Sequence, residues 1–339
     1  MAVSAGNSIQ EDDYNAIVTT INNVMGQGTG NTGYGQDTGL VHVAAGANVT
    51  AAQLEALRTQ INLARNHQSG NNSTVNQFYV GNIIGADASN TGTDNTVTRS
   101  STDTFSIDNV DNTKGFNDLE AAANGASIDR DSHGGTSLST TTVYNYGTAD
   151  LSFTSNWQRL QAVVRADFAG GYDASNANGT TTSTSVADHI RHFFNAGGSL
   201  SINARVQNNS GAKSNDWNTI IEAVSNVIVS ADEVTASSGT TSLSQRELTT
   251  SYQEIMTKSG SSGVYAENEY HIDARLNGNG LQFRIRFDDN DTGDQTGSGG
   301  PVDESVNGDV QIRIRTIAPT SGIIVAAPTW SVDTALGTY

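Results

Sequence analysis

The chain contains no cysteine, and only 3 of its 339 residues are proline. Without cysteine, a disulfide framework, a thiolate metal site and a cysteine nucleophile are all excluded. Aromatic residues make up only 6% of the chain, and its three tryptophans are far apart in the sequence. Sugar-binding clefts normally stack aromatic rings on their substrate, so nothing here marks such a cleft. Stability must therefore come from burial, hydrogen bonding and assembly.

Positively charged residues are also scarce. Lys and Arg together number 17 against 35 Asp and Glu, and the formal net charge is −18 at pH 7. Contacts with phosphates need clustered cations, so we expect no nucleic-acid partner. No stretch of about 18 consecutive apolar residues occurs, which predicts no membrane-spanning helix and no membrane partner. The N-terminus also has no cationic start followed by an apolar run, so we expect synthesis in the cytoplasm without a secretion signal.

The sequence is rich instead in glycine, serine, threonine and asparagine, which favour turns and short strands. Its 35% of hydrophobic residues are enough for modest cores. Between 81 and 114 large apolar residues are almost absent, so this stretch cannot order itself alone. A short helix is expected at 116–124. We therefore predict three regions: a helical anchoring or assembly region at 1–80, a polar arm or linker at 81–150, and a β-rich domain at 151–339.

Two amphipathic helices are predicted in the first region. Apolar residues recur at helical spacing over 13–25, after an acidic start that suits the helix dipole. The same spacing recurs from Thr50, a typical N-cap residue, to Ser69. The two segments align at an offset of 40 residues, which indicates either a duplicated unit or two amphipathic helices that pack on each other. We expect their apolar stripes to serve as packing faces in assembly, with the positions Tyr14, Ile17, Ile21, Leu54, Leu57 and Ile61.

A glycine-rich segment, GQGTGNTGYGQDTG at 26–39, separates these helices. Glycine loops can bring backbone N–H groups up to a phosphate, but this one lacks the Walker lysine and no strand precedes it. We interpret it as a connector that is either flexible or clamped by a partner.

The C-terminal region begins with a predicted strand at 160–168. A helix capped by Thr184 or Ser185 is expected to follow. Its Phe193 and Phe194 give it an apolar side, which we take as a further packing face in assembly.

Strict alternation at 200–206 then predicts a strand with one buried and one wet face. A helix is expected from about Ser214, and its β-branched end at 227–228 could instead turn into a strand. Four strand-like segments follow, which indicate an antiparallel meander: 270–276, 281–287, 310–317 and 323–332. The predicted fold class is α+β, with an N-terminal helical pair, a polar arm and a sandwich-like C-terminal body of antiparallel strands with packed helices.

Acidic residues crowd the turn at 288–294, which reads DDNDTGD. Such hard oxygen ligands are the kind that Ca²⁺ prefers, and the candidates are Asp288, Asn290, Asp291 and Asp294. The stretch does not follow the EF-hand pattern, and the alternative is an ordinary Asx-rich hairpin loop without a metal. No other cofactor is expected.

Two histidines, His189 and His192, lie three positions apart on the predicted Phe-rich helix. A zinc site would need a third ligand, and the HExxH pattern is absent. We interpret both as surface or interface histidines.

Four arginines stand out in a chain with so few cations, and they are Arg284, Arg286, Arg313 and Arg315. Their alternate positions on two predicted strands would give a sheet a wet, positive face. Acidic loops of this chain or of a neighbouring subunit would be their partners, which makes them interface candidates. The alternative is that they are ordinary solvated strand residues.

Catalytic signatures are missing from the sequence. It has no GxSxG elbow, no Walker A loop and no dinucleotide-binding glycine pattern after a strand. A pair of glycosidase carboxylates leaves little local signature, so counting does not exclude one. We nevertheless expect no enzymatic activity.

Taken in order, several segments resemble a family of virion structural proteins of tailed bacteriophages, often from myophages and cyanophages. DDYNAIVTTINNVMGQGTGNTGYGQ at 12–36 and VTAAQLEALRTQINLARNHQSG at 49–70 resemble that family's opening pair of helices. FFNAGG at 193–198 is a more specific part of the resemblance. The chain is also similar to the C-terminal half of the family in the stretches at 187–206, 248–256, 281–293 and 302–314.

The resemblance implies a structural component of the virion, in the tail or its baseplate, the neck or collar, or the fibre-attachment region. Such a protein would act as a homo-oligomer that docks to other phage structural proteins, and no catalytic residues carry over. Two other placements stay open: a receptor-binding fibre or adhesin that recognises a host surface glycan, and a decoration protein of the head. A tail glycosidase is the enzymatic alternative.

Overall fold

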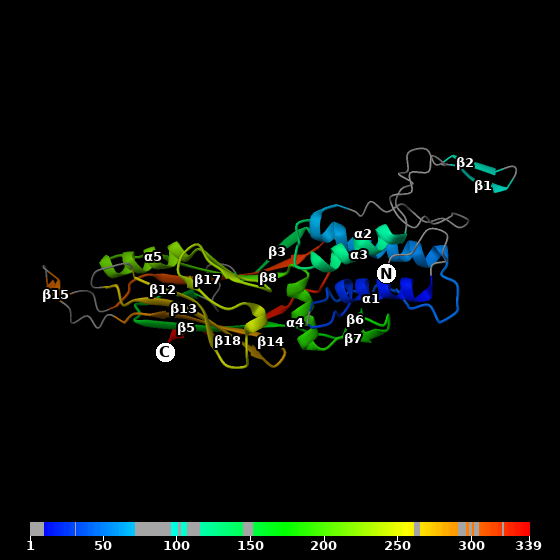
Figure 1. Ribbon diagram of the computed structural model, residues 1–339. Helices are drawn as coiled ribbons and strands as arrows, with labels where there is room; N and C mark the ends of the chain where they lie inside the picture. The colour runs from blue at the N-terminus through cyan, green and yellow to red at the C-terminus, as the bar shows by residue number, and fades with distance from the viewer. Residues whose placement is uncertain are drawn as a thin grey trace.

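The computed structural model describes residues 10–30, 32–71, 96–100, 103–106, 116–144, 152–260, 265–290, 296–297, 300–301, 305–320 and 322–339. Within these ranges the chain is an α+β protein with a β-rich body, which confirms the predicted fold class. Three helices gather at one end and most strands fill the other, so the molecule is elongated (Figure 1). No helix in the described ranges is long and apolar enough to cross a membrane.

The helical end consists of α1 (Glu11–Met25), α2 (Ala51–Ser69) and α3 (Phe116–Ile128). The two predicted N-terminal helices are confirmed, and the Thr50 hydroxyl caps α2 by accepting from the backbone N–H of Gln53 at 3.3 Å. α1 and α2 contact each other, as the packing interpretation of the two segments predicts. α3 packs against both, so the predicted helical pair is a three-helix unit.

The apolar stripes of α1 and α2 face the interior of this chain. Their six predicted packing residues are at most 2% exposed, and they share one hydrophobic cluster with Phe116 and Leu119 of α3. The prediction that these residues form an interface between subunits is therefore wrong, because the chain's own third helix and body cover them. The residues concerned are Tyr14, Ile17, Ile21, Leu54, Leu57 and Ile61.

The β-rich body contains two antiparallel sheets. The first sheet holds, in spatial order, β10 (Val234–Thr235), β9 (Asn226–Val229), β8 (Ser199–Gln207), β17 (Asp309–Pro319) and β3 (Leu138–Tyr144), with β4 (Ser152–Phe153) also paired to β17. The second sheet holds β11 (Thr240–Thr241), β12 (Gln253–Ser259), β13 (Glu269–Asn277), β14 (Gly280–Asp288), β5 (Arg159–Asp167) and β18 (Thr329–Thr338). Three two-stranded ribbons complete the strands: β1 (Thr96–Ser100) with β2 (Asp103–Ser106), β6 (Asp173–Ser175) with β7 (Thr181–Ser183), and β15 (Thr296–Gly297) with β16 (Gly300–Pro301).

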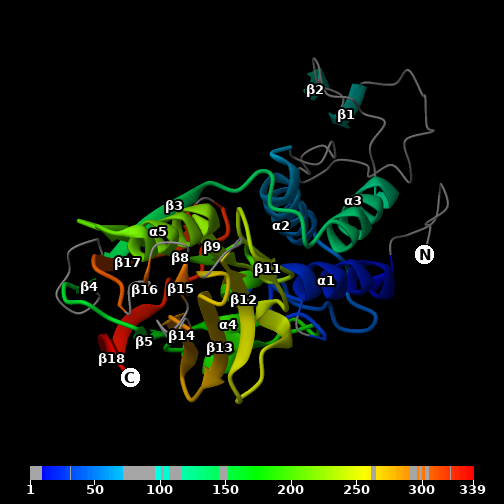
Figure 2. The same cartoon turned by 90° about the vertical axis from the view of Figure 1, so that its left-hand side faces the viewer.

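The two sheets lie one over the other (Figures 1 and 2), and apolar side chains of both belong to one buried cluster. β17 buries Ile312 and Ile314 on this side, and β14 buries Phe283 and Ile285. α5 (Ala212–Val224) contacts β8 of the first sheet and β12 of the second, so it bridges the two layers. One hydrophobic cluster runs through both sheets and the helices, as expected for a sandwich-like body with packed helices.

The predicted meander is only partly present. β13 and β14 form a hairpin, but the other neighbour of β14 is β5, and β17 lies in the first sheet between β8 and β3. The alternation of apolar residues indicates a strand with one buried face, and it does not say which sheet the strand joins. The last predicted strand also begins later, at Thr329, because Pro328 has no N–H for the ladder. The predicted helix from Ser214 ends at Val224 and a strand follows, which confirms the second of the two alternatives.

The stretch assigned to a polar arm, 81–150, contributes to both ends of the molecule. It contains α3, which packs on the helical end, and β3, which pairs with β17 in the first sheet. The ribbon of β1 and β2 also falls within it. The segment at 129–137 between α3 and β3 is also described, and the other residues of the arm lie outside the described ranges.

Candidate functional site

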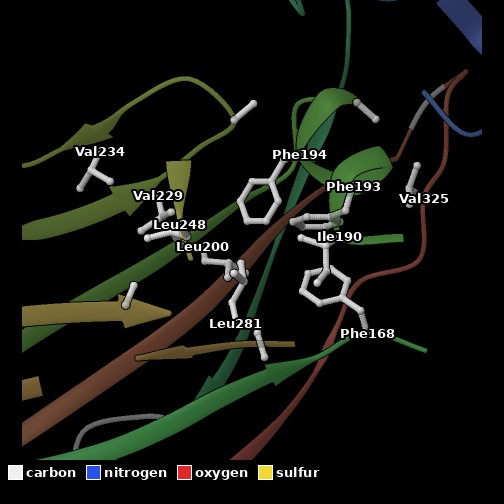
Figure 3. Packing of buried hydrophobic residues seen from close by; sticks show 14 of the residues in the cluster. Phe168, Ile190, Phe193, Phe194, Leu200, Val229, Val234, Leu248, Leu281 and Val325 are labelled. Atoms are coloured by element: carbon white, nitrogen blue, oxygen red, sulfur yellow. The ribbon is translucent and has the colours of Figure 1, made fainter. Parts of the chain in front are cut away.

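The zone where the helical end meets the body, here called the junction, is organised by α4 (Val186–Asn195) (Figure 1). The Ser185 hydroxyl caps this helix by accepting from the Asp188 backbone N–H at 3.2 Å, as the sequence predicts. Phe193 and Phe194 are 0% and 1% exposed, and Figure 3 shows their rings among apolar side chains that include Phe168. The prediction that they form an interface between subunits is wrong, because they fill the interior of this chain.

The glycine-rich connector at 26–39 folds back over the end of α1. Tyr34 is fully buried, and its backbone N–H donates to the Val24 carbonyl at 2.9 Å. At Gly26 a Cβ atom would lie 2.0 Å from the carbonyl oxygen of Ser175, so only glycine fits there. The connector is therefore clamped, and the clamp comes from this chain.

His189 and His192 face inward from α4 and are 3% and 0% exposed. His189 Nδ1 accepts from the Gly170 N–H at 3.0 Å, and its Nε2 donates to the Ala326 carbonyl at 2.8 Å. His192 Nδ1 is hydrogen-bonded to the Tyr172 hydroxyl at 2.6 Å. The interpretation as surface or interface histidines is therefore wrong, and both tie neighbouring loops to the helix. Burial lowers the pKa of both rings, that of His192 to about 4.

A second ring cluster in the junction was missed by sequence reasoning, because its members are far apart in the chain and follow no motif. The rings of Tyr34 and His67 are 4.9 Å apart, and those of His67 and His133 are 5.4 Å apart. His133 Nε2 donates to the Asn195 carbonyl at 2.6 Å, which links the cluster to α4. His67 is 2% exposed, and neither of its ring nitrogens has a hydrogen-bond partner among the described residues. Burial lowers its pKa to about 4.

A half-open cavity of about 360 Å³ lies beside the junction. Its lining includes Asp131, His133, Asp232 and Glu233. Arg246 balances part of this charge, since it bonds Asp131 at 3.2 Å and also pairs with Asp232. The cavity therefore offers a small polar molecule carboxylates and an imidazole.

The outer side of the second sheet carries a network of paired charges, here called the charged face. Arg284 and Arg286 of β14 both donate from Nε to Oδ2 of Asp273 on β13, at 3.0 and 3.1 Å. Arg286 also bonds Asp288 at 3.1 Å, and the Tyr339 hydroxyl donates to the same carboxylate. These arginines were expected to pair with acidic loops of this chain or of a neighbouring subunit. Their partners are carboxylates of this chain, and these lie on strands rather than on loops.

The charged face continues across neighbouring strands. The guanidinium groups of Arg275 and Arg284 each lie 4.3 Å from the ring centre of Tyr252. His271 lies between Glu254 and Glu269, with contacts of 2.9 and 3.1 Å. The arginines thus face carboxylates or an aromatic ring, and His271 faces two carboxylates, which fixes the pattern of this surface.

Arg313 and Arg315 lie elsewhere, on the outer side of β17 in the first sheet. They stand opposite Asn203 and Ser201 of β8. The prediction of one positive face shared by all four arginines is therefore wrong, because β14 and β17 belong to different sheets.

The acidic turn at 288–294 falls only partly within the described residues. Asp288 is engaged on the charged face, and Asn290 Nδ2 donates to a backbone carbonyl at 3.0 Å. Asp291 and Asp294 lie outside the described residues. In the part of the chain that the structure describes, no three His, Asp or Glu side chains are grouped to hold a metal ion. Calcium binding at this turn stays a prediction.

Asp273 holds the charged face together, so Asp273→Asn should destabilise the fold by about 2 kcal/mol. An amide cannot neutralise the two guanidinium groups that now share this carboxylate, and the Asp273 side chain is only 6% exposed. The loss should shrink at high salt, which screens the repulsion between the arginines. Urea unfolding at low and high salt measures it. Asp232→Asn is the matched control, because Asp232 is 53% exposed and should cost under about 1 kcal/mol; equal losses in both variants would contradict the assignment.

No protein-family model, no curated protein and no solved structure matches this chain. Among the described residues, the junction and the charged face each bring several polar and titratable side chains together.

Proposed function

We propose that the chain is a structural component of a tailed-bacteriophage virion, placed in the tail, the neck or the fibre-attachment region. The observation that carries the proposal is the resemblance of six segments to that family of structural proteins. All six segments overlap elements of the helical end, the junction or the sandwich, namely α1, α2, α4, β8, β12, β14 and β17. The resemblance therefore covers helices and strands that build the fold.

The protein works by self-association and by docking to neighbouring subunits. Its predicted apolar interface residues are buried in its own core, so contacts with copies and partners need other surfaces. The charged face suits this role, because its carboxylates and guanidinium groups are already held in place by bonds between strands. Complementary charge patterns give such docking its specificity and register more than its affinity.

Mass spectrometry of purified particles of the phage that encodes the chain tests the proposal. Peptides of this protein should be present in a fixed ratio to those of the other structural proteins, and antibodies against it should label the tail or neck in electron micrographs. Light scattering of the purified protein, with and without Ca²⁺, then gives the number of copies. A hexamer or dodecamer supports a tail or neck ring, and a trimer supports a receptor-binding fibre. Absence of the protein from intact particles overturns the proposal.

A further inference from the structure

A lysine, an aspartate and an asparagine meet inside the body, where solvent does not reach them. The side chains of Lys213 and Asp289 are 0% exposed, and Asn268 is 0% exposed as well. Asn268 directly precedes β13 and Asp289 directly follows β14, so the pairing of these strands brings the two together at the end of the hairpin. Lys213 comes from the first turn of α5.

The Asp289 carboxylate holds the other two side chains on its two oxygens. Lys213 Nζ donates to Oδ2 at 2.8 Å. In the amide orientation that satisfies its hydrogen bonds, Asn268 donates from its nitrogen to Oδ1 at 2.8 Å and accepts on its oxygen from Trp217 Nε1 at 3.2 Å. One carboxylate thus places an amine beside a carboxamide whose carbonyl is already polarised by an indole N–H.

Aromatic rings close this cluster off from water. The rings of Trp157 and Trp217 are 5.0 Å apart, and Phe287 lies 6.2 Å from Trp217. Lys213 Nζ is 5.9 Å from the ring centre of Tyr265. A fully buried ion pair is costly to maintain, and in such surroundings dipoles and hydrogen bonds act more strongly than they do in water.

We propose that Lys213 and Asn268 form an intramolecular isopeptide bond, with Asp289 as the proton carrier. The Asp289 carboxylate takes a proton from Lys213 Nζ, and the free amine attacks Cγ of Asn268 to form a C–N bond. The Trp217 N–H stabilises the oxygen of the tetrahedral intermediate. Asp289 gives the proton it holds to Nδ2 and takes one of the two protons that remain on Nζ, and the Cγ–Nδ2 bond breaks. The ammonia that leaves takes this last proton from Asp289 and departs as ammonium.

The reaction balances without any further reactant. A lysine ammonium and a carboxamide become one secondary amide and one ammonium ion, and Asp289 ends as it began. Asn268 is the acceptor rather than Asp289, because a bond to Asp289 would consume the proton carrier and would require oxygen to leave from a carboxylate.

The bond would staple α5 to the β13–β14 hairpin across the side of the sandwich. A cross-link between positions far apart in sequence restricts the unfolded chain in the way that a disulfide does. A chain without cysteine would thereby gain a covalent link that reducing agents do not break.

Intact-mass spectrometry of the purified full-length protein tests the proposal. The mass should be lower than the sequence mass by one ammonia, and a protease digest should yield one branched peptide that joins Lys213 to Asn268. Lys213→Arg, Asn268→Ala and Asp289→Asn should each have the full sequence mass, whereas the control Lys258→Arg should keep the loss of ammonia.

Three results would overturn the proposal. The first is a wild-type protein that unfolds cooperatively, and is therefore folded, yet has the full sequence mass. This result does not depend on whether any variant folds. The second is the loss of one water with a branch at Asp289 instead of Asn268. The third is an Asp289→Asn variant that forms the bond as completely as the wild type does, because this variant lacks the proposed proton carrier.

Discussion

Acidification from about pH 6.5 to about pH 4 should lower the free energy of unfolding by about 6 kcal/mol through two buried histidines alone, His67 and His192. Burial lowers the pKa of each ring from 6.5 to about 4 in the folded chain. Each histidine therefore accounts for about 3 kcal/mol of this loss in the free energy of unfolding. The total is comparable to the whole stability of a typical domain, so the protein should unfold or open at its junction in mild acid.

The direction follows from proton counting. Between pH 6.5 and 4 the unfolded chain binds protons on these two side chains and the folded chain does not, so stability rises with pH across this window. The stability linked to these two uncharged rings is fully present above about pH 6.5 and is lost as the pH falls to about 4. Asp188 acts in a lower window: burial opposes its ionisation, but bonds from Arg191 and Ser185 outweigh burial and lower its pKa to about 2. Its stabilisation is lost only as the pH falls below 3.8, the ordinary pKa of an aspartate side chain.

Urea unfolding in buffers from about pH 7.5 down to about pH 4 measures the effect. His67→Phe should remove about 3 kcal/mol of the loss between pH 6.5 and 4, because it removes one of the buried titrating histidines. It should cost little at neutral pH, since neither ring nitrogen of His67 has a hydrogen-bond partner among the described residues. Ile128→Ala is the control, because Ile128 is 80% exposed and carries no titratable group, so its truncation should leave the profile unchanged. A wild-type profile that is flat from pH 6.5 to 4 would contradict the assignment.

The elements that sequence reasoning predicted correctly have strong local signals. α2 and α4 each begin after a hydroxyl side chain that accepts from a backbone N–H three residues on, Thr50 in one case and Ser185 in the other. The sequences of β8 and β14 alternate apolar residues with glycine or polar residues, which is typical of a strand. Caps and periodicity act over a few residues, so they can be read before any tertiary contact is known.

The errors concern what covers an apolar surface. The stripe with Tyr14 and Ile17 looks the same whether a second copy or another helix of the same chain packs on it. Here α3, which follows α2 only after a long polar stretch, packs against it. Periodicity therefore predicted which residues are buried and could not predict by what.

The polar clusters were missed for a related reason. His67 and His133 meet only because α2 and the segment after α3 converge, and Lys213 meets Asp289 only because α5 crosses the hairpin end. Neither pair has a motif spacing, so each depends on the tertiary fold. The partners of Arg284 and Arg286 were easier to predict, since a carboxylate on an adjacent strand is a common neighbour for an arginine.

Phe193→Ala should lower the free energy of unfolding by about 3–5 kcal/mol, because it removes a fully buried ring from the centre of the junction. The ring lies 5.6 Å from Phe168 and 5.3 Å from Phe194, centre to centre. The fit is tight on another side as well, since a Cβ atom at Gly198 would lie 2.6 Å from the end of this ring. Ile128→Ala is the control, because Ile128 is 80% exposed and its truncation should cost less than about 0.5 kcal/mol.

The same variant separates a core role from an interface role. If Phe193 packs within one chain, the loss of stability is the same at every protein concentration. If it packed between copies, the unfolding midpoint of the wild type would rise with protein concentration and that of Phe193→Ala would rise less, because association stabilises by mass action. Urea unfolding of both proteins over a hundredfold range of concentration decides between these roles. A concentration-dependent difference would place Phe193 in a contact between copies, and a constant difference supports its place in the core of one chain.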